Sequence, residues 1–192
     1  MVLSIISLFK FICEINIIKK LNIFLIKKIM ESSKENEITE IKLITKEGKE
    51  IPLSKKACEL SELLKGAINE YPKETSFPLN ELDEKNGELI KEYLSHFNGE
   101  APKEIEKPIT SNEIKNLTDE WSSNFIDKIP LEDLTNLTVA ANYMGINCLL
   151  DLCCAKVATL CKDKNEEDIF KMFKITETFS EEEKNKIKPF FT

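Results

Sequence analysis

The sequence predicts an α+β fold, in which a small α/β unit is followed by a purely helical part. Residues 40–45 alternate apolar and polar side chains, as a half-buried strand does. From residue 118 onward the apolar residues instead recur at helical spacing. We divide the 192 residues into an apolar and basic extension (1–37), an α/β part (38–100), a flexible connector (101–117) and a helical part (118–192).

The α/β part is predicted to run in the order strand, strand, helix, strand, helix. Gly48 lies in the turn between the first two strands, where a positive φ is easiest for glycine. Pro52 indicates that the second strand is an edge strand or ends there. Ser54 is a plausible N-cap for the first helix. A third strand at 75–79 and a helix at 89–97 complete a unit whose sheet is covered by helices.

The helical part is predicted to hold three longer helices and two short ones. Gly145 fits the residue just past the end of a helix, which predicts a tight corner between the second and third. The connector before these helices has two prolines and no periodicity, so we expect a flexible loop. The predicted helices are 121–129, 131–144, 147–161, 166–173 and 180–187.

The charge pattern argues against a nucleic-acid partner. All 27 basic residues are lysines, and 34 acidic residues give a net charge of −7. Residues 30–192 hold 22 of the lysines against 33 acidic side chains. A chain that is acidic and has no arginine lacks the bidentate contacts by which proteins recognise phosphates and guanine. We therefore expect no nucleic acid among its partners.

The sequence predicts no catalytic residue, no metal site and no cofactor. His96 is the single histidine, and its place near the end of a helical pattern is typical of a surface histidine. The six cysteines form no C-x-x-C pair, and four of them share one apolar helical stretch, which favours buried thiols in a reducing compartment. No phosphate-binding glycine loop or H-E-x-x-H motif is present. These observations favour a binding module that is not an enzyme.

Residues 1–29 allow three interpretations. They are apolar at 19 of 29 positions and carry a net charge of +4, but lysines interrupt the run that a membrane-spanning helix requires. Met30 opens a polar stretch typical of a leader into a folded domain, so the extension is either an upstream addition or a disordered tail. The third interpretation is a membrane or targeting segment, although we expect a membrane to be an unlikely partner. The sequence alone leaves these alternatives open.

The stretch 139–151, which reads VAANYMGINCLLD, resembles the signature A-A-N-Y-L-x-I-x-x-L-L-D of the S-phase kinase-associated protein (Skp) family. This family comprises the F-box adaptors of SCF cullin–RING ubiquitin ligases. Further segments agree with the family in order and spacing over about residues 39–188. They are Ile41–Leu43 with the Gly48 turn, Phe77–Leu79, Trp121-x-x-x-Phe125, Glu166–Ile175 and Phe179–Glu183.

The resemblance implies a BTB/POZ-type domain with a C-terminal helical extension and no enzymatic activity of its own. It implies a non-catalytic adaptor that bridges a cullin and F-box substrate receptors, in contact with the RING subunit and E2 only indirectly. The family's setting implies ubiquitin-dependent protein degradation in the cytoplasm and nucleus. Because an exposed apolar surface often self-associates, we also expect a weak homodimer.

The resemblance further implies two binding surfaces. Asn142 and Tyr143 match the family's cullin-facing pair, and tyrosine is a residue type that anchors interfaces; the alternative is that Tyr143 belongs to the core of the domain. The F-box-binding positions are matched by apolar residues that could also be ordinary core. They are Leu150, Cys154, Val157, Cys161, Ile169, Phe173, Ile175, Phe179 and Ile187.

Two other functions compete with the F-box adaptor. An elongin-C-like adaptor shares the BTB-type domain but ends near the A-A-N-Y helix pair, whereas this sequence continues for about 40 residues beyond Asp151. A membrane-tethered interaction protein would use residues 1–29 as its working part. One departure from the family is Ser122, which follows Trp121 where the family has an aspartate.

Overall fold

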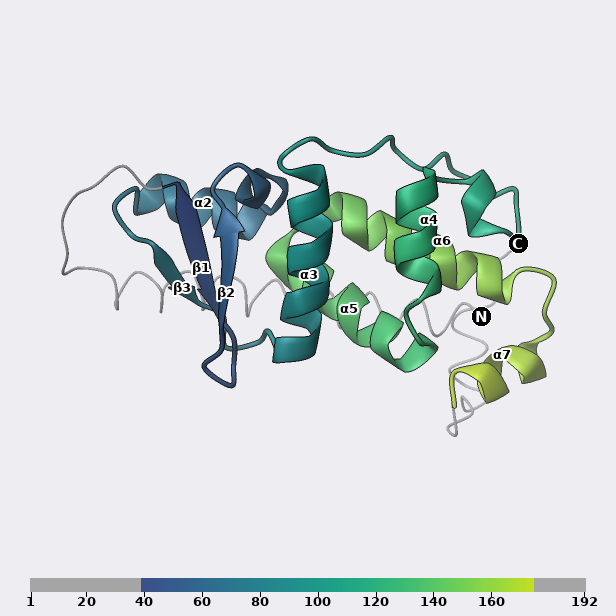
Figure 1. The fold of residues 1–192 in the computed structure, drawn as a ribbon. Coiled ribbons are helices and arrows are strands. Elements are labelled where there is room, and N and C mark those ends of the chain that lie inside the picture. Colours follow the sequence, from purple (N-terminus) through teal and green to yellow (C-terminus); the bar gives the residue numbers. More distant parts are fainter. Residues whose placement is uncertain (1–38, 175–192) are drawn as a thin grey trace, which may run out of the picture.

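The computed structural model describes residues 39–174 and shows an α+β fold in which the sheet and the far end of the helical part lie at opposite ends (Figure 1). The class and the predicted order of elements are confirmed within these residues. The elements are β1 (Glu40–Ile44), β2 (Glu50–Ser54), η1 (Ala57–Leu60), α2 (Glu62–Glu70), β3 (Ser76–Pro78), α3 (Glu84–Phe97), η2 (Ile114–Asn116), α4 (Glu120–Asp127), α5 (Leu131–Met144), α6 (Asn147–Cys161) and α7 (Glu166–Met172).

The sheet has the strand order β2-β1-β3, with β1 antiparallel to β2 and parallel to β3. Ile41 and Leu43 of β1 are fully buried, as the alternation of the sequence predicts. Pro52 lies on β2, which is an edge strand and therefore tolerates a residue without a backbone donor. The predictions for this sheet are confirmed.

The first helix begins later than predicted. The Ser54 hydroxyl accepts the Ala57 amide at 3.1 Å, but Ala57 opens only the short 3₁₀ turn η1. The α-helix α2 begins after Ser61, whose hydroxyl accepts the Leu64 amide at 3.2 Å. The same hydroxyl donates to the buried carbonyl of Met144 at 2.6 Å, so tertiary contact decides which serine caps the helix.

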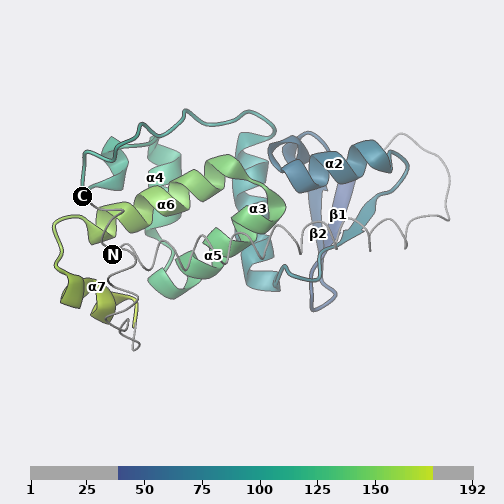
Figure 2. The same cartoon turned by 180° about the vertical axis from the view of Figure 1, so that it is seen from behind.

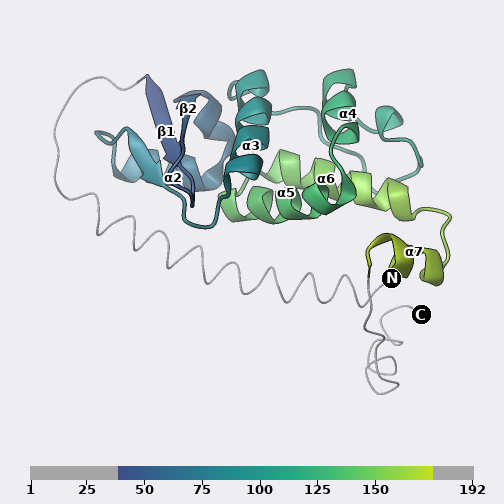
Figure 3. The same cartoon turned by 60° about the horizontal axis from the view of Figure 1, so that its bottom comes forward.

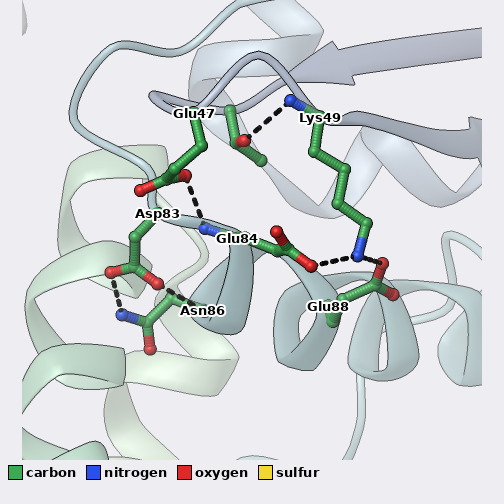
Figure 4. A network of polar contacts seen from close by, with 7 residues as sticks. Glu47, Lys49, Asp83, Glu84, Asn86 and Glu88 are labelled. Carbon is green, nitrogen blue, oxygen red and sulfur yellow. Dashed lines mark hydrogen bonds and ion pairs between the residues drawn. The ribbon is translucent and has the colours of Figure 1, made fainter.

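A polar network fixes the start of α3 against the β1–β2 turn (Figure 4). The Glu84 amide donates to the Glu47 carboxylate at 3.0 Å, and the Lys49 ammonium lies 2.5 Å from Glu84 and 3.0 Å from Glu88. Asp83 caps the helix by accepting the Asn86 amide at 2.8 Å. Because these ion pairs are exposed, they orient the helix more than they stabilise it.

The corner between α5 and α6 is built as predicted, on Gly145 at φ 64°. Its amide donates to Asn142, and its carbonyl accepts the Glu62 amide of α2 at 3.2 Å. The Asn147 side chain also donates to the Glu62 carboxylate at 2.8 Å. Figure 2 shows the same arrangement from behind, with α6 running beside α5. The corner therefore joins the helical part to the α/β part.

The connector packs on the core at two points. Ile105 and Ile114 are buried, and Ile114 opens the 3₁₀ helix η2. Lys107 forms an ion pair with Asp151 of α6 at 2.9 Å. The sequence pattern missed these anchors because isolated isoleucines in a polar stretch have no periodicity. The loop is thus attached to the core at these residues, and its flexibility between them stays a prediction.

Aromatic side chains join α3 to α4. His96 is exposed at the end of α3, as predicted, and its ring stacks on Trp121 with the centroids 3.7 Å apart. Trp121 stacks in turn on Phe125 at 5.2 Å, and Tyr93 lies beneath this cluster. Asp119 caps α4 by accepting the amide and hydroxyl of Ser122, the residue that replaces the family's aspartate.

Some predictions fall on residues that the structure leaves out. The extension 1–37 and the predicted helix 180–187 lie outside the described range. Among residues 39–174, no helix combines the length and apolar character needed to cross a bilayer. The last helix within the described residues is α7 (Figure 3).

Candidate partner-binding surfaces

Helix α6 has two apolar faces, of which only one is buried. Leu149, Leu152 and Cys153 are almost fully buried in the core of the domain. The stripe that the sequence predicted lies on the other face. Cys154 is exposed there, and Leu150, Val157 and Cys161 are half-buried. The structure thus brings the four predicted α6 positions together on one side of the helix.

The stripe on α6 is only partly used by the core. Leu150 and Val157 pack against the edge of the core cluster, so the core interpretation holds in part for these two residues, and their contact with an F-box protein stays a prediction. Cys154 and Cys161 do not belong to that cluster. An apolar helix face that the described residues cover incompletely is typical of a surface that binds another protein.

Helix α7 is held by few contacts of its own. Ile169 is 5% exposed, but it lies outside the main core cluster. Phe170, Met172 and Phe173 are half-buried. Lys174, just after the helix, forms an ion pair with Glu132 at the start of α5. The figures place α7 at the end of the molecule away from the sheet, next to the end of α6 (Figures 1 and 3).

Sequence reasoning found two of the apolar residues of this segment and missed two. Ile169 and Phe173 were predicted positions, whereas Phe170 and Met172 were not. The missed residues could have been found from the composition of this seven-residue helix, which has three large apolar residues on more than one side. The predicted positions Ile175, Phe179 and Ile187 lie outside the described residues. We call the following set the α6–α7 apolar surface: Leu150, Cys154, Val157, Cys161, Phe170, Met172 and Phe173.

Tyr143 does not present its ring to solvent. The side chain is 3% exposed and belongs to the core cluster, because it lies on the inner side of α5 with Ala140 and Met144. The expectation of an exposed tyrosine for docking is therefore wrong, and contact between this residue and a cullin stays a prediction. Its neighbour Asn142 is half-buried, and its amide nitrogen has no hydrogen-bond partner among the described residues.

The chemistry of the described residues is that of packing. Burial raises the pKa of the Cys58 and Cys153 thiols to about 12, and it also raises the pKa of the Cys154 thiol. A thiol with a raised pKa is a poor nucleophile at neutral pH. Within residues 39–174, no group of three or more side chains could hold a metal ion. A cavity of about 290 Å³ lies between the connector and the start of α6, with Asp151 at its rim.

Comparisons with known proteins find a family model that matches part of this chain and relatives that match most of it. Residues 147–189 match the family described as "Skp1 family, dimerisation domain", a range that contains α6 and α7. The chain is 37% identical over 150 residues to an S-phase kinase-associated protein 1 homolog from Tetrahymena thermophila, which covers 78% of this chain and 90% of the relative. Over 160 residues it is 29% identical to the E3 ubiquitin ligase complex SCF subunit sconC of Arthroderma benhamiae, covering 83% and 95%.

The relatives match nearly their whole length, and the alignment with the Tetrahymena protein is close enough to establish descent. The α+β fold with C-terminal helices also agrees with the BTB/POZ-type architecture that the resemblance implies. This chain therefore belongs to the Skp1 family.

Proposed function

We propose that this chain is a non-catalytic adaptor that joins F-box proteins to a cullin in an SCF-type E3 ubiquitin ligase. The observation that carries the proposal is the incompletely covered α6–α7 apolar surface in a chain of this family. Relatives named as SCF subunits support the assembly. An adaptor of this kind needs two surfaces, and neither requires a reactive side chain.

The α6–α7 apolar surface is the proposed F-box site. Cys154 and Phe173 offer apolar area that the described core does not use, and Leu150 and Val157 connect that area to the core. A helix that packs here would bury apolar side chains of both proteins, which contributes about 25 cal/mol for each Å² removed from water. Specific complexes of this kind bury roughly 1,200–2,000 Å² in total.

The outer side of α5 is the proposed cullin site. Asn142 lies there with an unsatisfied amide nitrogen, and Val139, one turn earlier, is half-buried. A buried polar atom without a partner is costly, so a rearrangement that lets this nitrogen donate a hydrogen bond to an acceptor of a cullin would be favoured. Tyr143 supports this site from the core side of the helix. Asn142 thus replaces Tyr143 as the central contact of the proposal.

Several finer parts of the function rest on family membership alone. We propose indirect contact with a RING subunit and an E2, and residence in the cytoplasm and nucleus. We also propose that two copies associate weakly through the α6–α7 apolar surface in molecules where nothing else covers it, because an exposed apolar surface often self-associates. Analytical ultracentrifugation with and without an F-box domain tests this, since the F-box domain would dissolve the dimer.

The alternatives are disfavoured by specific observations. An elongin-C-like adaptor would not need α7, whereas α7 is formed here and carries half-buried apolar side chains. A membrane-tethered protein would act through residues 1–29. Fractionation of the full chain and of a chain that starts at Met30 separates this function from the adaptor, because only a tether depends on the missing segment.

A binding experiment with two purified partners tests the adaptor directly. Cys154→Glu adds a charge to an exposed position of α6. We therefore expect it to weaken binding of an F-box domain at least tenfold and to leave binding of a cullin N-terminal domain unchanged. Asn142→Lys is expected to do the reverse. Asn124→Glu, on an exposed position of α4, is the matched control and should change neither.

Isothermal titration calorimetry measures both affinities, and thermal unfolding shows that each variant is folded. If the parent chain bound neither partner, the adaptor function would be wrong. If each substitution weakened both partners equally, the assignment of two separate surfaces would be wrong.

A further inference from the structure

Two apolar features of this chain are candidates for contact with each other. One is the α6–α7 apolar surface, which is incompletely covered by the described residues. The other is the run Met1–Phe9, which contains no charge and seven large apolar side chains. Exposing either to water is unfavourable by about 25 cal/mol for each Å² of apolar surface. Contact between the two would remove both costs without a second molecule.

Charge favours this contact at long range. Residues 1–29 carry a net charge of +4, whereas residues 30–192 carry −11. Near the surface itself, Asp163, Glu167 and Asp168 are exposed and form no ion pair within the described residues; the exposed Lys164 and Lys171 partly offset them. A cationic apolar segment is thus attracted to the body of the protein rather than repelled from it.

The chain is long enough to make the contact. Twenty-nine residues, 10–38, join the run Met1–Phe9 to Thr39. A fully extended chain of that length spans about 95 Å, and a continuous helix about 44 Å. A folded unit the size of residues 39–174 has a radius of gyration of about 14 Å. The segment can therefore reach from the sheet end to α7 at the other end (Figure 3).

We propose that residues 1–29 bind the α6–α7 apolar surface of their own chain, with Met1–Phe9 in direct contact, and that an F-box protein must displace them. The competition with an F-box protein rests on the proposed function, whereas the docking itself does not. A tether of this length gives an effective concentration of about 1 mM. With an intrinsic Kd of about 0.1 mM, the docked segment would weaken F-box binding roughly tenfold.

The exposed thiol of Cys154 reports docking without any partner. In the full-length chain we expect iodoacetamide to alkylate Cys154 several times more slowly than in the full-length variant Leu8→Asp/Phe9→Asp, as measured by mass spectrometry of the peptide. The buried Cys153 should stay unmodified in both and so shows that the fold is intact. The matched control Asn16→Asp/Asn22→Asp adds the same two charges but removes no apolar side chain, and it should behave like the parent.

Affinity for an F-box domain is the second measurement, and the Leu8→Asp/Phe9→Asp variant should bind about tenfold more tightly than the parent. Equal alkylation of Cys154 in parent and variant would overturn the proposal, whatever the F-box result. Slow alkylation that depends on protein concentration would show that a second copy covers the surface, which also overturns it. Binding of the parent to phosphatidylcholine–phosphatidylserine vesicles with unchanged alkylation would assign the segment to membranes instead. Protection of Cys154 in a chain that binds no F-box domain would support the docking and contradict the proposed function.

Discussion

At the scale of single residues, the corner between α5 and α6 depends on Gly145. Its φ of 64° lies in the left-handed region, and a Cβ at this position would lie 2.9 Å from the Cβ of Glu62. We expect Gly145→Ala to lower the free energy of unfolding by about 1–3 kcal/mol, through backbone strain and displacement of α2. Urea denaturation followed by circular dichroism measures this.

Gly66 provides the matched control for that substitution. It lies within α2, and a Cβ there would meet nothing within 4 Å. Gly66→Ala should therefore raise the free energy of unfolding by about 0.5–1 kcal/mol, because alanine favours a helix over glycine. Equal effects of the two substitutions would mean that the geometry of the corner is unimportant.

The buried thiol of Cys58 predicts a loss of stability in alkaline solution. Burial raises its pKa from about 9 to about 12, so the folded protein keeps the proton that the unfolded chain releases. The free energy of unfolding is unaffected below pH 9 and falls as the pH rises toward 12, by up to about 1.4 kcal/mol per pH unit for this group. Cys58→Val should make this fall less steep in urea titrations at pH 8 to 11. An unchanged slope would contradict the burial of the thiol.

Single residues are also where sequence reasoning was least reliable. The sequence predicts Ser54 as the cap, whereas Ser61 caps α2 and is held there by its contact with Met144. Tyr143 matched a family position, but a sequence pattern does not show which side of α5 faces the core. Both errors concern contacts between residues more than 80 positions apart or between two sides of one helix, which local patterns do not contain.

At the scale of elements, α6 shows what periodicity can predict. The spacing of Leu150, Cys154, Val157 and Cys161 predicted one face, and the structure places that face away from the core. The helix is apolar on both sides, so composition alone could not tell the partner-binding side from the buried one. Gly145, which terminates α5, was predicted because the left-handed conformation strongly favours glycine.

The two faces of α6 should respond differently to a charge. Val157→Asp is expected to lower the free energy of unfolding by only about 1–2 kcal/mol, because this side chain borders the core. It is also expected to weaken binding of an F-box domain at least tenfold. Leu152→Asp places a carboxylate in the core and should prevent folding. Chemical denaturation and calorimetry measure both. A folded Leu152→Asp variant, or full F-box binding by Val157→Asp, would contradict the assignment of the faces.

At the scale of the whole molecule, the sequence predicts the order of elements, the edge position of β2 and the corner between α5 and α6. It does not predict how the connector is anchored. Ile114 is buried because η2 lies against α4 and α6, which are distant in sequence from the strands, and Ile105 is buried as well. The proposed F-box surface runs along α6 and ends at α7, at the end of the molecule away from the sheet (Figure 1). Segments with few buried contacts open at low free-energy cost.

The proposed adaptor function depends on an apolar surface at α6–α7 that a helix of an F-box protein completes. Hydrogen exchange of the full-length variant Leu8→Asp/Phe9→Asp, in which residues 1–29 are expected to leave this surface open, with and without a purified F-box domain, tests it most directly. We predict that amides of α7 and of the last turn of α6 exchange quickly in the free chain and become at least tenfold slower in the complex, while amides of β1 stay slow in both. Amides of α7 that are equally slow in both states would show that the surface is already complete, and would contradict the account.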